Sequence, residues 1–138
     1  MFKKTIGLFL LAVGYVGGLG AAGPDAEGAR LYFISPVDGA TVSSPVTVRF
    51  GLSGFGVAPA GVQNAKAGHH HLIIDSELPP LDRPVPTDDH HRHFGGGQTE
   101  AEISLPPGEH TLQLLLGDYA HTPHNPAIIS ERITIIVE

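Results

Sequence analysis

The sequence predicts an all-β fold: an immunoglobulin-like antiparallel β-sandwich of about six or seven strands that follows a signal peptide. Three observations support this fold class. The 138 residues include 12 prolines and 18 glycines, spread so widely that long helices are excluded. Apolar and polar residues alternate in several short runs, which is the pattern of half-buried strands. Turn sequences rich in proline and glycine separate these runs.

Two strands are predicted in the first half of the chain. Residues 31–34 form an apolar run that ends at a Ser-Pro pair, and a Pro-Val-Asp-Gly turn follows. Residues 46–52 then alternate between apolar and polar or small side chains, which predicts a half-buried strand. Residues 53–68 are expected to form a loop.

Four further strands are predicted in the second half. Residues 69–75 and 98–105 are the first two, and a Pro-Pro-Gly turn follows the second. The last two carry the alternating apolar residues Leu112, Leu114 and Leu116, and then Ile129, Ile133, Ile135 and Val137. Residues 76–97 contain four prolines without alternation. They are expected to form a long proline-rich loop, and such loops are usually functional or disordered.

The N-terminus predicts a signal peptide over residues 1–22. Lys3 and Lys4 form a short basic region, an apolar run extends from Ile6 to Leu19, and small residues follow up to Ala22. A membrane anchor is the alternative, but it needs about 20 apolar residues and this run is shorter. We therefore expect cleavage after Ala22, a single β-sandwich domain over residues 23–138, no stable membrane insertion, and a periplasmic or secreted protein.

Net charge indicates which classes of partner the protein can bind, and cysteine content shows whether disulfides can stabilise it. Without Lys3 and Lys4 the chain has six basic and 14 acidic residues, a net charge of −8 with neutral histidines. Nucleic acids and anionic membranes bind basic patches, so neither is an expected partner, whereas an acidic surface attracts cations. The chain has no cysteine, so no disulfide stabilises the exported domain.

Histidine is the most informative residue type. Eight of the nine histidines fall into three clusters: His69-His70-His71, His90-His91-x-His93 and His121-x-x-His124. Histidine is the commonest metal ligand in proteins and titrates near neutral pH. In a sandwich of alternating up and down strands, the connections that carry these clusters lie at the same end. We therefore expect the three clusters to converge, and His110 to lie at the opposite end.

Spacing within the clusters selects the candidate ligands. Side chains two residues apart share one face of a strand, and two histidine pairs have this spacing. A third pair flanks a proline that stiffens its loop. The predicted metal ligands are His69, His71, His91, His93, His121 and His124. Among the others, His70 is expected at the core edge with a hydrogen bond to a backbone carbonyl, His90 in a solvated loop, and His110 in a structural role.

The ligand atoms available in this chain limit which metal ions it could bind. Copper(I) and blue-copper sites need thiolate or thioether ligands, which the mature chain lacks. Imidazole with carboxylate suits copper(II), zinc or nickel, of which copper(II) or zinc is the expected ion, and no organic cofactor is expected. Four carboxylates could orient a ligating imidazole: Asp75, Glu100, Asp118 and Glu131. The three glycines at 95–97 lack the helix and lysine of a phosphate loop, so they predict a tight turn beside a crowded site.

Three segments carry a family resemblance. They read Gly-His-His-His-Leu-Ile-Ile-Asp at 68–75, His-Phe-Gly-Gly-Gly-Gln-Thr-Glu at 93–100, and Pro-Gly-Glu-His-Thr-Leu-Gln-Leu-Leu-Leu-Gly-Asp at 107–118, with the His-x-Pro-His motif soon after. They resemble a bacterial family of small exported proteins that is catalogued only as a domain of unknown function. The resemblance covers residues 68–137 and implies no activity. It implies that the family motif includes His69, His70, His71, His93, His110, His121 and His124.

Three functions remain open. The first is an exported β-sandwich that binds a divalent transition metal ion for buffering, delivery or sensing. The second is a non-catalytic module that binds an envelope protein and whose histidines join its long loops by hydrogen bonds. A metal-dependent hydrolase or oxidase is the third and has the least support, because it needs an open coordination position and a substrate pocket, and the sequence shows neither.

Overall fold

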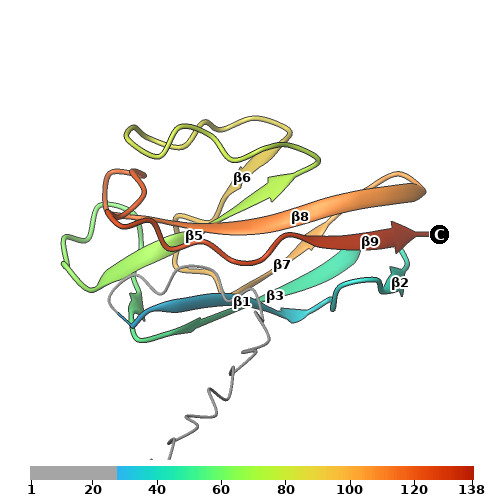
Figure 1. Ribbon diagram of the computed structural model, residues 1–138, viewed down its shortest axis with the longest axis horizontal. Helices are drawn as coiled ribbons and strands as arrows, with labels where there is room; N and C mark the ends of the chain where they lie inside the picture. The colour runs from blue at the N-terminus through green and yellow to red at the C-terminus, as the bar shows by residue number, and fades with distance from the viewer. Residues whose placement is uncertain (1–27) are drawn as a thin grey trace, which may run out of the picture.

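The computed structural model describes residues 28–138, which form two packed β-sheets and no helix (Figure 1). The all-β prediction is therefore confirmed. The predicted signal peptide, residues 1–22, lies outside the described residues. The smaller sheet has the order β1-β3-β7, and both of its pairings are antiparallel. Its strands are β1 (Arg30–Ser35), β3 (Val46–Ser53) and β7 (Glu100–Ile103).

The larger sheet has the order β2-β9-β8-β5-β4, and β6 pairs with β5 beside β4. Its long pairings, β5 with β8 and β8 with β9, are antiparallel as expected. The two-residue strands β2 and β4 instead run parallel to β9 and β5, respectively. The strands are β2 (Thr41–Val42), β4 (Gly56–Val57), β5 (Ala67–Ile74), β6 (His91–His93), β8 (Gly108–Gly117) and β9 (Ile133–Val137).

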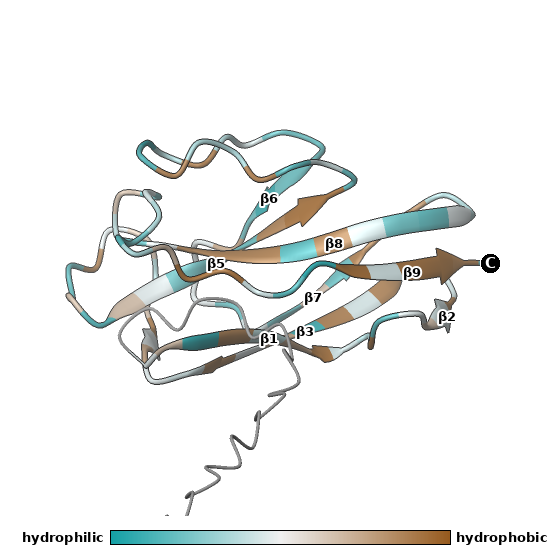
Figure 2. Ribbon diagram, viewed as in Figure 1, coloured by the Kyte–Doolittle hydropathy of each residue, from teal (hydrophilic) through white to brown (hydrophobic). Residues whose placement is uncertain are grey.

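The core lies between the two sheets and follows the two-residue period of the strands. Apolar segments therefore recur along β3 and β8 in Figure 2. The cross-strand pair Leu72 and Leu114 is fully buried there, with Val48 on the opposite sheet. Each such side chain contributes about 1.5–3 kcal/mol by leaving water. These contacts hold β5 and β8 in one register, which determines which β5 side chains point away from the core.

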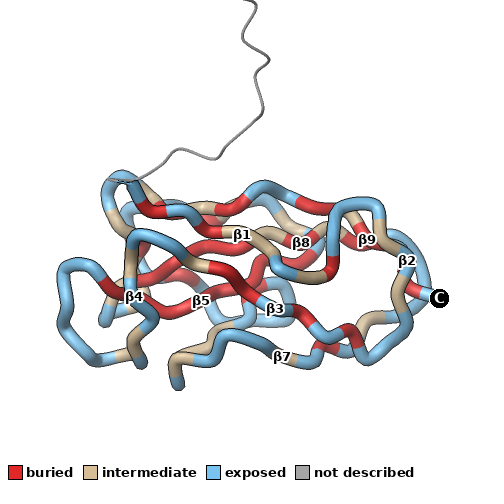
Figure 3. The backbone as a smooth tube through the Cα atoms, turned by 90° about the horizontal axis from the view of Figure 1, so that it is seen from below, coloured by how far each residue is buried: buried red, intermediate tan, exposed pale blue. Residues whose placement is uncertain are grey.

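Strand β5 is buried on both faces. All eight of its residues are buried, as the continuous red tube in Figure 3 shows. One face belongs to the core, and chain segments cover the other. Val85, from the segment that Figure 1 shows above β5 and β8, packs with Ile73 and Leu115 in a second apolar cluster. The outer face of β5 is therefore enclosed.

The proline-rich segment 76–97 contains the short strand β6, which the sequence did not predict. Its three residues are His-Arg-His, and they show no apolar alternation. Their pairing with β5 comes from the tertiary fold. Within residues 28–138, no helix has the length and apolar character needed to cross a bilayer.

Candidate metal centre

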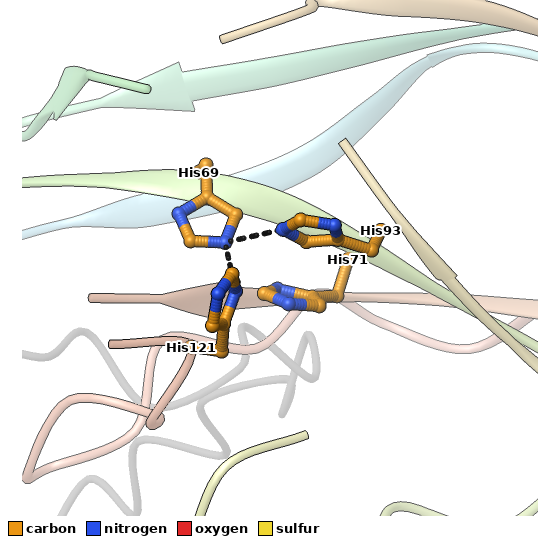
Figure 4. A group of neighbouring side chains, drawn as sticks. All are labelled: His69, His71, His93 and His121. Carbon is orange, nitrogen blue, oxygen red and sulfur yellow. Dashed lines mark hydrogen bonds between the residues drawn. The ribbon is translucent and has the colours of Figure 1, made fainter. Parts of the chain in front are cut away.

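Four histidines from three separate segments converge on the outer face of the larger sheet (Figure 4). His69 and His71 come from β5, His93 from β6, and His121 from the turn after β8. One ring nitrogen from each histidine lies within 4.8 Å of the corresponding nitrogens of the other three. The expected convergence therefore occurs for these four residues, although on a sheet face rather than at the open end of the sandwich.

Strand register explains how these side chains meet. The two-residue period turns His69 and His71 away from the core, because His70 and Leu72 face it. His71 is the direct cross-strand partner of His93, so both side chains project from the same face. The tight turn that follows β8 brings His121 over this face. The site therefore depends on the register of β5, β6 and β8.

The distances between nitrogens suit a single metal ion. His69 Nε2 lies 3.0 Å from His121 Nδ1 and 3.1 Å from His93 Nε2. Metal–nitrogen bonds of about 2.0–2.1 Å separate neighbouring ligands by about 3.3 Å in a tetrahedron and about 2.9 Å in a square plane. These two distances match neighbouring ligands of one ion, and the ring nitrogens that lie farther apart, by up to 4.8 Å, must move closer together to complete either geometry.

Hydrogen bonding alone leaves this cluster incompletely satisfied. A neutral imidazole nitrogen carries either one hydrogen or one lone pair. His69 Nε2 can therefore make one well-formed hydrogen bond, yet two ring nitrogens approach it within 3.1 Å (Figure 4). A cation between the rings would use the lone pairs of all of them at once.

The centre has a buried floor, formed by His69 and His71, and a more open rim, formed by His93 and His121. His69 and His71 are 0% and 1% exposed, whereas His93 and His121 are only partly buried. Two glycines leave room for the rings. A Cβ atom on Gly117 would lie 3.0 Å from His71 Nδ1, and one on Gly95 would lie 2.7 Å from His93 Nε2. The prediction of a glycine turn beside a crowded site is therefore confirmed.

Burial keeps the floor histidines neutral. Loss of solvent, together with the smaller effect of the neighbouring imidazoles, lowers the pKa of His69 to about 4 and that of His71 to about 3. The pKa of His93 is also lowered, first by burial and then by His121. Metal ligation requires the neutral imidazole, so protons compete weakly for this site at neutral pH.

The other two predicted ligands lie outside this group. His91 Nδ1 donates a hydrogen bond of 2.7 Å to Asp88, three residues earlier in the chain. His124 Nε2 donates to the carbonyl of Ala67 at 3.2 Å, and its ring meets Phe55 edge-on. Both rings are thus directed by local partners, which the spacing of histidines along the chain does not reveal.

His70 faces the core, as expected, but its predicted hydrogen bond to a carbonyl is wrong. The ring is fully buried with its centroid 4.9 Å from that of Phe50, and neither ring nitrogen has a hydrogen-bond partner among residues 28–138. Burial lowers its pKa to about 4. His90 is exposed, as expected of a solvated residue, and its Nδ1 donates to the carbonyl of Ile74.

The four candidate carboxylates do not support the ligands by hydrogen bonds. Asp75 bonds His110, Glu100 pairs with Arg49, and Asp118 accepts backbone N–H groups. In residues 28–138, no hydrogen bond joins the carboxylate group of these three or of Glu131 to the ring of a clustered histidine. Within the described part of the chain, the Nδ1 atoms of His69 and His71 are buried without a hydrogen-bond partner. The expectation that one of these carboxylates bonds and orients a clustered imidazole directly is therefore wrong.

His110 has the structural role expected of it. Its Nδ1 donates to Asp75 at 2.7 Å and its Nε2 donates to the carbonyl of Pro106 at 2.8 Å. Both acceptors require a hydrogen on the ring, so the protonated imidazole makes the full set of bonds. The hydrogen bond to Asp75 is the main cause of the raised pKa of His110.

We expect His110→Ala to lower the free energy of unfolding by about 2 kcal/mol at pH 6, because two hydrogen bonds of a charged ring are lost. Because the pKa is raised, the part of this contribution that depends on the charge is complete below the unfolded value of 6.5 and is lost as the pH rises through the folded pKa. Urea unfolding of the native protein and the variant at pH 6 and pH 9 measures the loss of unfolding free energy at each pH. Equal losses at the two pH values would contradict the prediction. The control is His90→Ala, at an exposed position.

Comparison with known proteins gives a family and no function. No curated protein and no solved structure matches the chain. One family model matches residues 48–138, a range that includes all nine histidines and strands β4 to β9. The earlier resemblance is thereby confirmed, and the chain belongs to the family of the domain of unknown function DUF4399.

Proposed function

We propose that this protein binds one divalent transition metal ion, copper(II) or zinc, through His69, His71, His93 and His121. The observation that carries the proposal is the convergence of four imidazole nitrogens within 4.8 Å of one another. Imidazole suits copper(II) and zinc, and copper(II) binds nitrogen ligands most tightly among the common divalent ions. The absence of cysteine, and of methionine beyond Met1, disfavours copper(I).

The proposed role is buffering, delivery or sensing of the ion outside the cytoplasm, with no organic cofactor. Export rests on the signal-peptide pattern of residues 1–22. Exchange of the ion is supported by the site's construction, because His93 and His121 are only partly buried while the other two ligands are fixed on β5. The acidic composition of the chain favours the approach of cations.

The competing hypothesis is that the histidines only join loops, on a module that binds an envelope protein. Two ring nitrogens, one from His93 and one from His121, lie close to His69 Nε2, and this argues against the competing hypothesis. His69 Nε2 can form a good hydrogen bond with only one of them. A network selected for hydrogen bonding would instead give each of these ring nitrogens a partner of its own.

Calorimetric titration of untagged, exported protein tests the proposal. The protein should be purified without a nickel column and stripped with a chelator. We expect one copper(II) or zinc ion per chain with a dissociation constant below micromolar, and binding that weakens as acid protonates the imidazoles. Absence of a binding signal for both ions at micromolar protein would refute the proposal.

His121 provides a separate prediction, because its backbone has a φ of 65°, in the left-handed region. A residue with a Cβ atom pays about 1–2 kcal/mol for this conformation, and glycine does not. His121→Gly should therefore be about 1 kcal/mol more stable than His121→Ala without metal. Both variants should lose metal affinity equally, because both lack the imidazole. Chemical unfolding and metal titration of the pair measure this, and equal stabilities would contradict the assigned strain.

A further inference from the structure

The turn after β8 holds a histidine where such turns normally hold glycine. His121 N donates to Asp118 O at 3.0 Å, and Asp118 N donates to Thr122 O at 2.8 Å. These are the hydrogen bonds of a three-residue loop whose last residue is left-handed, a position that favours glycine. His121 occupies that position with a φ of 65°. Backbone strain of this kind persists only when the surroundings enforce it, and it concentrates at functional sites.

The side chain of Asp118 holds this turn from within by two hydrogen bonds. Its Oδ1 atom accepts hydrogen bonds from the backbone N–H groups of Ala120, at 2.8 Å, and Thr122, at 3.0 Å. These two residues flank His121 on either side. One carboxylate oxygen therefore holds the peptide unit directly after the strained residue and the unit between Tyr119 and Ala120.

Two neighbouring segments hold the same turn from outside. Gly61 N donates to the carbonyl of Tyr119, and Val85 N donates to the carbonyl of His121, each at 2.9 Å. The backbone of the turn is thus attached on both sides. With the turn in place, the ring of His121 lies against that of His69, as Figure 4 shows.

We infer that Asp118 is a positioning residue, whose side chain holds the turn in the conformation that presents His121 to the metal ion. This inference rests on the proposed metal site and adds to it a residue that does not touch the ion. Asp118 also influences the centre by charge, since it acts on His69 electrostatically. Asparagine separates the two effects, because its side-chain oxygen accepts the same hydrogen bonds without the charge.

A double-mutant cycle tests the inference. Asp118→Ala should weaken metal binding at least tenfold in the native protein and less than twofold in the His121→Ala background, because a positioning residue acts through the ligand it positions. Asp118→Asn should stay within about threefold of the native affinity. Equal losses in both backgrounds, or an Asn variant as weak as the Ala variant, would overturn the inference.

Asp88→Ala is the matched control. Asp88 Oδ1 also accepts a backbone N–H, that of His90, and it bonds His91, which lies outside the four-histidine group. Its removal should change affinity less than twofold. A loss as large as that of Asp118→Ala would show that any weakened turn lowers affinity, and would overturn the specific role of Asp118.

A measurement without metal keeps this inference distinct from the proposed function. Nuclear Overhauser contacts between the ring protons of His69 and His121 should be present in the metal-free native protein and in Asp118→Asn, and absent in Asp118→Ala. If the native protein binds no metal, the proposed function fails while these contacts still decide the role of Asp118. Contacts that persist unchanged in Asp118→Ala would overturn it.

Discussion

Replacing His69 with alanine is expected to weaken the binding of copper(II) or zinc at least about 100-fold, or about 2.7 kcal/mol. The reason is its central place in the group: its Nε2 lies 3.0 Å from His121 and 3.1 Å from His93. The substitution removes one ligand and leaves an empty space in the buried part of the site, next to His71. Competition titration against a chelator of known affinity measures the change.

His124→Ala is the control for this experiment. His124 belongs to the same sequence pattern and is also partly buried, but its ring bonds the carbonyl of Ala67 and lies outside the group. We expect the metal affinity of the His124→Ala variant to remain within threefold of that of the native protein. Similar losses from His69→Ala and His124→Ala would mean that the ion is held elsewhere, or by a different set of histidines.

Acid is expected to destabilise the metal-free protein far more than a typical small domain. His70 is fully buried, and burial lowers its pKa from 6.5 to about 4. Between these values the unfolded chain takes up a proton that the folded chain refuses, so stability falls as the pH falls from 6.5 to 4. This residue alone costs about 3 kcal/mol over that range, and His69 and His71 act in the same direction.

Urea unfolding at several pH values between 7.5 and 4, with a chelator present, measures this loss. His70→Leu should lower the number of protons taken up on unfolding by about one, because leucine does not titrate. The substitution should be tolerated, since the site lies among apolar side chains. The variant should therefore lose less stability than the native protein between pH 6.5 and 4. Native stability that stays level over this range would show that the buried histidines titrate normally.

Most of the fold follows from local patterns in the sequence. The strands β1, β3, β5, β7, β8 and β9 were all predicted, because each presents apolar side chains at a period of two to a single core. The strands β2, β4 and β6 were not. They are two or three residues long and exist because a neighbouring strand pairs with them, which composition and periodicity cannot reveal.

The centre was only partly accessible to sequence reasoning. Spacing correctly placed His69 and His71 on one face of a strand, because alternation is a local property. The same spacing joined His91 to His93, but the two residues have different neighbours: His93 lies opposite His71, whereas His91 lies opposite Ile73 and bonds Asp88. Strand register decides that difference, and it depends on the whole sheet.

His121 and His124 separate for a similar reason. The chain between them has a left-handed residue at its start, so the two rings leave the turn in different directions. Gly117 and Gly95 were further signals, because each faces a histidine ring that a larger residue would displace. A glycine next to a histidine cluster can therefore mark the space that the cluster requires.

The most direct test of the central claim is anomalous X-ray diffraction from crystals of the exported protein, loaded with copper(II) or zinc and recorded at the absorption edge of that metal. The proposal predicts one strong anomalous peak about 2 Å from ring nitrogens of His69, His71, His93 and His121. A peak at any other place, or crystals of the loaded protein that show none, would contradict it.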